Sequence, residues 1–190
     1  MRLNKVSLAA APGAALLIAA IVLMGYEKML LPLLTAVTVH EAGHVIMLFV
    51  MGCRITKVEA GATGLKISYS GTVSYLGEVL AALAGPAFGI LSALIFAAFK
   101  MHTFCGVNIA LSAFNLLPAR PLDGGKALYN GLCIFLLPHQ AEGICRGIEC
   151  LVTMLIISGG TYILLDTGKN ATLLILGLIM LIRLVKLYRE

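Results

Sequence analysis

Long apolar runs, separated by short charged intervals, constrain this chain of 190 residues more than any other feature. Hydrophobic residues make up 60% of the sequence and charged residues 12%, whereas about 25% of the residues in a typical soluble domain are charged. So few charges cannot cover a water-exposed globule. Because one spanning helix needs roughly 20 apolar residues, about six spans leave no room for a separate soluble domain. The sequence predicts a single integral membrane domain over residues 1–190.

The positions of these runs predict the order of the elements. Helices are expected at 7–26, 29–53, 76–99, 147–165 and 171–185, together with a fourth run that starts after Lys100 and breaks at Pro118. The polar interval 54–75 has strand-like alternation around a turn at Gly61 to Gly64, which favours a β-hairpin over a disordered loop. The predicted fold class is an all-α polytopic membrane protein with about six transmembrane helices, a small β-hairpin between helices two and three, and a broken fourth helix.

The basic residues predict the orientation in the membrane. If the N terminus is cytoplasmic, all 14 Lys and Arg residues except Lys28, Lys100 and Lys169 fall on the cytoplasmic side, as short cytoplasmic loops require. We therefore predict a multi-pass protein of a prokaryotic cell membrane, with both termini and the hairpin in the cytoplasm. The net charge of +5 is scattered, so nucleic acid is not expected as a partner. Five cysteines without CxxC spacing are predicted to be free thiols.

The second apolar run contains the motif HEAGH, with His40 and His44 four residues apart. On a helix this spacing puts both imidazoles on one face, and Glu41 lies about 100° around the axis. All three lie near the middle of the run, where an ionisable side chain costs about 2.5–3.5 kcal/mol on insertion scales. A divalent cation would offset that cost. The pattern predicts two metal ligands and a base for a metal-bound water, in preference to histidines that only bond to their neighbours.

A hydrolytic zinc site needs three protein ligands and an open position for water. The residues available as the third ligand are His102, His139, Glu78, Asp123 and Asp166. We expect surface positions for His102 and Asp166, a loop for His139 and the membrane interface for Glu78. Asp123 is favoured, because two prolines and two glycines interrupt the apolar region around it, and broken backbone at membrane depth is tolerated where it lines a cavity. This segment either re-enters the membrane or continues the crossing through 127–137.

HEAGH together with the downstream segment NLLPARPLDGG at 115–125 resembles the site-2 protease family of intramembrane zinc metalloproteases, and in particular its sporulation protease type. The resemblance covers about residues 29–130, which we take as the core. It implies one Zn²⁺ ion held by His40, His44 and Asp123. It also implies that Glu41 is the catalytic base, and that Asn115 helps to hold the reacting carbonyl or the substrate backbone.

The resemblance implies hydrolysis of peptide bonds in membrane-associated regulatory proteins within the lipid bilayer, such as an inactive sigma factor or an anti-sigma factor, in regulated intramembrane proteolysis. It also allows an inhibitory membrane partner. The alternative is a catalytically silent membrane protein that binds metal or recruits partners, although such a relative would be expected to lose Glu41 first. A metal transporter would need ligands repeated along a pathway, and the sequence has one cluster.

Two features depart from the family. Gly89 stands where the family's AGP segment is usually followed by an asparagine, which puts any role of that asparagine in doubt. Sporulation-type members commonly carry a nucleotide-sensing CBS domain after the last helix. This sequence ends at Glu190, so regulation of that kind is expected to be absent.

Overall fold

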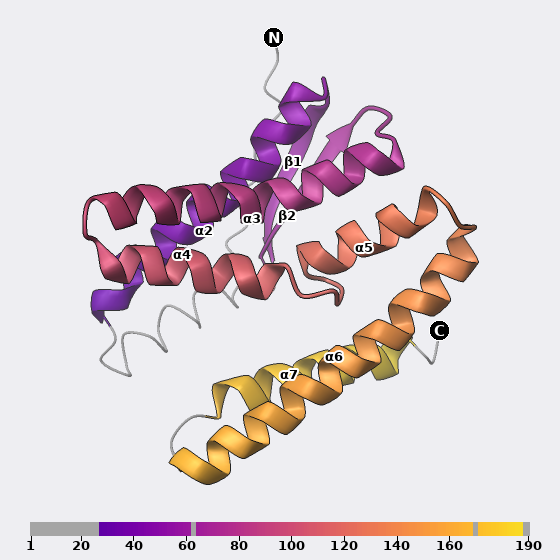
Figure 1. Cartoon of the computed structure of the whole chain (residues 1–190). Coiled ribbons are helices and arrows are strands. Elements are labelled where there is room, and N and C mark those ends of the chain that lie inside the picture. Colours follow the sequence, from indigo (N-terminus) through magenta and orange to yellow (C-terminus); the bar gives the residue numbers. More distant parts are fainter. Residues whose placement is uncertain (1–26, 62–63, 169–170, 188–190) are drawn as a thin grey trace. The chain divides into compact units, whose positions relative to one another are not determined.

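The computed structural model describes residues 27–61, 64–168 and 171–187; the helix predicted at 7–26 lies outside them. The elements in this part of the chain are α2 (Glu27–Val50), β1 (Arg54–Gly61), β2 (Gly64–Ser70), α3 (Tyr75–Ala98), α4 (His102–Asn115), α5 (Asp123–Cys133), α6 (Pro138–Thr167) and α7 (Thr172–Leu187) (Figure 1). The predicted helical fold with one small hairpin is confirmed. Two compact units, Met1–Leu116 and Leu117–Glu190, are described separately below, and the single domain stays a prediction.

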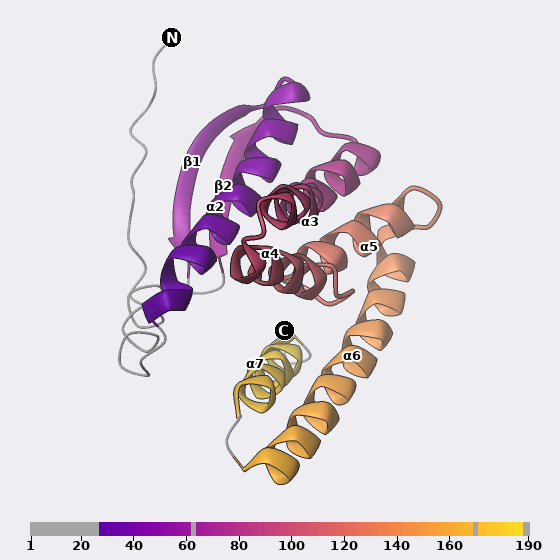
Figure 2. The ribbon, with the colours of Figure 1, turned by 60° about the vertical axis from the view of Figure 1, so that its left-hand side comes forward.

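In the first unit, α2 and α3 pack against each other and α4 contacts both of them (Figure 2). Small residues permit the close approach of α2 and α3. A β-carbon built on Gly43 would lie only 2.6 Å from the carbonyl oxygen of Ala84 and 3.0 Å from Cβ of Phe88. Glycine therefore lets the two backbones touch, as small residues do where membrane helices pack.

The hairpin follows α2 through a tight turn, in which Gly52 has a φ of +77° that favours glycine. β1 and β2 are antiparallel, with Arg54 opposite Ser70, Gly61 opposite Gly64 and one irregularity after Ile55. This confirms the hairpin predicted at 54–75. The Tyr69 hydroxyl donates a hydrogen bond to the carboxylate of Glu78 on α3, so the hairpin is tied to the helix that follows it.

Glu78 is half-buried in the first turn of α3. Ser74 caps that turn, since its hydroxyl accepts the Gly77 N–H at 3.2 Å. Burial, and then the hydrogen bond to Glu78, raise the pKa of Tyr69 above its usual value. The phenol therefore stays protonated as the donor of this bond.

In the second unit, α6 packs against both α5 and α7. The sequence predicts a fifth helix at 147–165, and its predicted start is wrong, because α6 begins at Pro138. His139, predicted to lie in a loop, is in its first turn. Proline suits the first position of a helix, the Gln140 side chain accepts the Leu137 N–H at 3.3 Å, and Glu142 binds Arg146 one turn later at 3.0 Å. Polar residues that interrupt an apolar run thus belong to the start of this helix.

The predicted break in the fourth run is confirmed. α4 ends at Asn115, and α5 begins at Asp123 and ends at Cys133. Between them lie Pro118 and Pro121, which have no N–H group to continue a helix. The run is therefore two short helices, of 14 and 11 residues, joined by a proline-rich loop at 116–122.

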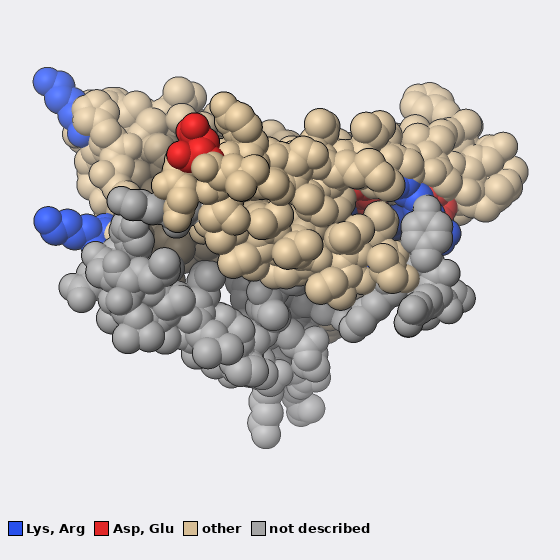
Figure 3. All heavy atoms as spheres, turned by 90° about the horizontal axis from the view of Figure 1, so that it is seen from below, with Lys and Arg blue, Asp and Glu red and all other residues tan. Residues whose placement is uncertain are grey.

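The described part of the chain contains three helical segments that are long and apolar enough to cross a bilayer: Lys28–Val50, Tyr75–Ala98 and Pro138–Thr167. A shorter apolar segment, Thr172–Val185, lies in α7. Large apolar side chains such as Phe49, Phe135 and Leu165 are 75%, 86% and 81% exposed, and the described surface in Figure 3 is mostly uncharged. Surfaces of this kind mark contact with lipid or with another protein, so the fold fits a polytopic membrane protein.

Candidate metal centre and catalytic site

His40 and His44 face each other on one side of α2. Their Nε2 atoms are 3.2 Å apart, and the rings cross at 79° with centroids 4.9 Å apart. Two nitrogen ligands in a tetrahedral zinc site, each about 2.0–2.1 Å from the ion, are about 3.3–3.4 Å from each other. The two nitrogen atoms therefore have the spacing that one shared ion requires.

The opposite ring nitrogen of His44 is held by α3. Its Nδ1 lies 2.7 Å from the backbone carbonyl oxygen of Ala81. A carbonyl oxygen only accepts hydrogen bonds, so the proton is on Nδ1 and the lone pair is on Nε2. A carbonyl behind a metal-binding histidine fixes its tautomer and orientation in this way. This ring is thus prepared to bind a metal through Nε2.

Gly85 of α3 leaves room beside both Nε2 atoms. A β-carbon at this position would collide with Nε2 of His44 and lie 2.9 Å from Nε2 of His40. Any other side chain would occupy the space next to the lone pairs. Sequence reasoning noted the AGP segment that contains Gly85 but did not assign this glycine to the site.

Gly89 lies one turn further along α3. A β-carbon here would collide with the hydroxyl of Ser112 on α4. Ser112 is buried and takes the space that a larger side chain at position 89 would need. This packing is a physical reason for the absence of the asparagine that the family usually has.

Glu41 and Asn115 also belong to the first unit. Glu41 follows His40 on α2 and is half-buried. Asn115 is the last residue of α4 and is half-buried, and its Nδ2 donates to the carbonyl oxygen of Leu111 at 3.0 Å. An amide carries two N–H groups, so this bond uses one of them. Their catalytic roles stay predictions.

Asp123 belongs to the second unit, where it is the first residue of α5 and is buried. One carboxylate oxygen lies 2.9 Å from Nζ of Lys126, and the helix N-terminus favours a negative charge at this position. A β-carbon on Gly125 would collide with the backbone of Ala119 and Arg120. The second glycine of the DGG motif thus lets α5 begin directly against the preceding loop.

The other candidates for a third ligand lie elsewhere. His102, His139 and Asp166 are exposed, in the first turns of α4 and α6 and the last turn of α6, and Glu78 is bound to Tyr69. Two histidines and a carboxylate are a donor set typical of catalytic zinc. The histidine pair therefore fits such an ion, and Asp123 as its third ligand stays a prediction.

Three comparisons with known proteins bear on the fold and the family. No family model matches the sequence. The chain is 35% identical over 121 residues to the stage IV sporulation protein FB of Bacillus subtilis (strain 168). The alignment covers 56% of this chain and 41% of that protein. The chain thus spans less than half the length of this relative.

Among solved structures, the chain is similar to a site-2 protease from Methanocaldococcus jannaschii. The TM-score is 0.68, at 20% sequence identity, with 98% of this chain and 94% of that chain covered. At this identity the likeness establishes the fold, which is that of a polytopic membrane protein.

Proposed function

We propose, since this chain belongs to the site-2 protease family, that it is an intramembrane zinc metalloprotease that cleaves membrane-associated proteins. The observation that carries the proposal is the pair of Nε2 atoms 3.2 Å apart on α2, with Glu41 next to His40 in an apolar helix. Two histidines with a purely structural role would not require a carboxylate beside them inside an apolar helix. A site that activates water does require a carboxylate there, as the base that accepts the proton of the water.

In this proposal His40, His44 and Asp123 hold the ion through two imidazole nitrogens and one carboxylate oxygen. Zn²⁺, when bound, polarises a carbonyl and lowers the pKa of a coordinated water. Glu41 accepts the proton of the attacking water and returns it to the amine of the departing peptide. Asn115 donates an N–H to the carbonyl oxygen of the bond that is cleaved, on which negative charge develops.

A transmembrane helix hides its peptide bonds, so a substrate has to become extended before it is attacked. The hairpin offers strand edges for this step, since β1 and β2 form a two-stranded sheet within the described residues. A substrate segment that adds to such an edge gains main-chain hydrogen bonds and is held in the extended form. We propose this role for the hairpin in place of a simple tether.

The substrate class is a membrane-associated regulatory protein, such as an inactive sigma factor or an anti-sigma factor. The support is the 35% identity to a stage IV sporulation protein and the resemblance of the motifs. An inhibitory membrane partner and a cytoplasmic location of both termini belong to the same proposal. The competing function is a catalytically silent protein that uses the same residues to hold metal or recruit partners.

The test compares purified wild type with Glu41→Gln, in one detergent, on a panel of fluorescent single-span membrane peptides. We expect the wild type to cleave at least one peptide, and the variant to lose about 10²–10⁴-fold of the rate, as expected for a general base, while it keeps its zinc. Equal cleavage by both proteins would contradict the protease. Zinc in both and cleavage by neither would favour the silent protein.

The ligand set is tested by zinc content. His40→Ala and Asp123→Ala are expected to lose the ion, whereas the matched control His139→Ala, on the exposed start of α6, is expected to keep it. Wild-type zinc content in Asp123→Ala would remove this residue from the set and leave the histidine pair to be completed by another ligand.

A further inference from the structure

The loop at 116–122 makes few backbone hydrogen bonds. Ala119 N–H donates to Leu117 O at 2.8 Å, and Leu122 N–H donates to Ala119 O at 3.0 Å, while the two prolines have no N–H to donate. The backbone N–H of Arg120 donates instead to Oε1 of Glu149 at 3.0 Å. This acceptor is a side chain of α6, 29 residues further along the chain.

Glu149 is 4% exposed and accepts a second bond, from Nε of Arg120 at 2.6 Å. A buried carboxylate is costly unless it is paired and hydrogen-bonded. Here one oxygen receives both the main chain and the side chain of the same loop residue. Oε1 of Glu149 is therefore satisfied by this loop.

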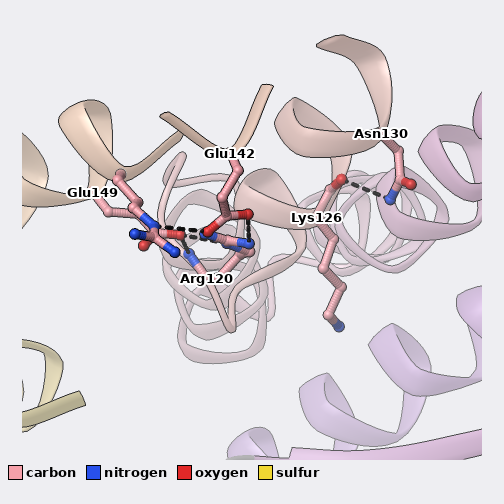
Figure 4. A network of polar contacts seen from close by, with 6 residues as sticks. Arg120, Lys126, Asn130, Glu142 and Glu149 are labelled. Carbon is pink, nitrogen blue, oxygen red and sulfur yellow. Dashed lines mark hydrogen bonds and ion pairs between the residues drawn. The ribbon is translucent and has the colours of Figure 1, made fainter. Parts of the chain in front are cut away.

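We call the two bonds between Arg120 and Glu149 the anchor of this loop. The other guanidinium nitrogens of Arg120 add further contacts to it, as Figure 4 shows. Nη1 and Nη2 of Arg120 each bind one oxygen of Glu142 at 2.8 Å, and the guanidinium carbon lies 5.5 Å from the centre of the Tyr129 ring on α5. Glu142 and Glu149 are seven residues apart, two turns along one face of α6. A single loop residue thus links the loop, α5 and α6.

The anchor lies close in the chain to Asp123, the proposed third ligand of the metal. Arg120 precedes Asp123 by three residues, and the first turn of α5 packs on the backbone of Ala119 and Arg120 because Gly125 has no side chain. A fixed Arg120 backbone therefore fixes the start of α5. A loop released from Glu149 would lose these two bonds to α6.

We infer that Glu149, acting through Arg120, is a positioning residue that holds the loop and the first turn of α5 so that Asp123 keeps the orientation for metal binding. The inference rests on the proposed function. It assigns to a buried acid of α6 a task that neither the HEAGH nor the DGG motif reveals. A purely structural role, as an ion pair that stabilises α6, is the outcome against which it is tested.

The experiment measures the zinc dissociation constant of the full chain in detergent, by competition with a chelator, together with the unfolding temperature of the zinc-free protein. Glu149→Ala is expected to raise the dissociation constant about tenfold or more, within the range for residues that orient a ligand. Glu149→Gln keeps an oxygen that accepts the Arg120 N–H, so it is expected to recover most of the affinity. Glu142→Gln separates the two parts of the anchor: it weakens the contact to the Arg120 guanidinium but keeps the main-chain bond to Glu149, so it is expected to raise the dissociation constant less than Glu149→Ala does. His139→Ala, on the exposed start of the same helix, is the control and is expected to bind zinc as the wild type does.

The outcomes separate the two roles. A lower unfolding temperature with an unchanged zinc dissociation constant in Glu149→Ala would overturn the inference and leave a structural ion pair. If this variant does not fold, Arg120→Met with Glu149→Leu takes its place, because it removes both charged side chains together with the acceptor of the residue-120 N–H. We expect lower zinc affinity in this double variant than in Arg120→Met with Glu149→Gln, which keeps that acceptor; equal affinity in the two double variants would overturn the inference. Wild-type zinc binding by His40→Ala would instead refute the metal site itself.

Discussion

At position 85, the absence of a side chain decides how much space the two histidine nitrogens have. The β-carbon of alanine would collide with Nε2 of His44 and press on His40. Gly85→Ala is therefore expected to weaken zinc binding by about tenfold or more, in line with changes that misorient a ligand, as measured by chelator competition. Gly106→Ala is the matched control on α4, because among the described residues no atom lies within 4 Å of its β-carbon. Equal zinc affinity in both variants would show that α3 does not lie next to the metal position.

The sequence predicted only part of this arrangement at the level of residues. The facing of His40 and His44 follows from the helix period, which is a local property. The carbonyl of Ala81 and the space at Gly85 come from α3, and the Glu149 anchor comes from α6. Contacts between distant segments leave no periodic pattern in the sequence, so neither the HEAGH motif nor the DGG motif indicates them. The AGP segment is visible in the sequence, but the reason for its glycine is clear only from the packing of α3 on α2.

In the second unit, the backbones of α6 and α7 approach each other closely at Gly160. A β-carbon on Gly160 would lie 2.6 Å from the backbone nitrogen of Leu174, whereas one on the adjacent Gly159 would lie 3.9 Å from a methyl group of Leu173. Gly160→Ala is therefore expected to destabilise the protein by about 1–3 kcal/mol through overpacking, seen as a lower unfolding temperature in detergent. Gly159→Ala is expected to be neutral or slightly stabilising, because alanine is the better helix former by about 1 kcal/mol. The reverse order of the two variants would contradict this packing.

The hairpin depends on its bond to α3. Tyr69→Phe removes the hydroxyl that donates to Glu78 and is expected to cost about 1 kcal/mol. This loss should speed hydrogen exchange of the β2 amides about fivefold if they exchange by local opening. Tyr75→Phe is the control, since that ring is exposed at the start of α3. Unchanged exchange in Tyr69→Phe would mean that the hairpin is held by other contacts.

Helix boundaries show where sequence reasoning succeeds at this scale. The limits of α3 and the break after α4 were predicted to within a few residues, because apolar runs end sharply at Lys100 and at Pro118. The predicted start of α6 is too late because Glu142 and Arg146 resemble a polar loop. In the structure Glu142 binds both Arg120 and Arg146, so these charges mark contacts within the second unit and not the end of a helix.

For the whole molecule, the distribution of basic residues predicts that the hairpin faces the cytoplasm and that the α3–α4 turn faces the outside. Single cysteines at the exposed positions Thr72 and His102, in a chain without its native cysteines, test this in intact cells. A membrane-impermeant thiol reagent is expected to label His102→Cys from outside and Thr72→Cys only after lysis. Labelling in the opposite order would invert the orientation.

The contact of the α2 and α3 backbones at Gly43 closes one side of the histidine pair to an entering polypeptide. An extended strand needs about 5 Å of clearance to lie beside another backbone, and the seam offers less than that, with Ala84 in direct contact. In the proposed protease, a substrate segment would then have to reach the histidine pair from a different side. A covalent cross-link between α2 and α3 at this position is accordingly expected to leave the proposed peptide hydrolysis intact, whereas a cross-link that closes the side from which the substrate enters would stop it.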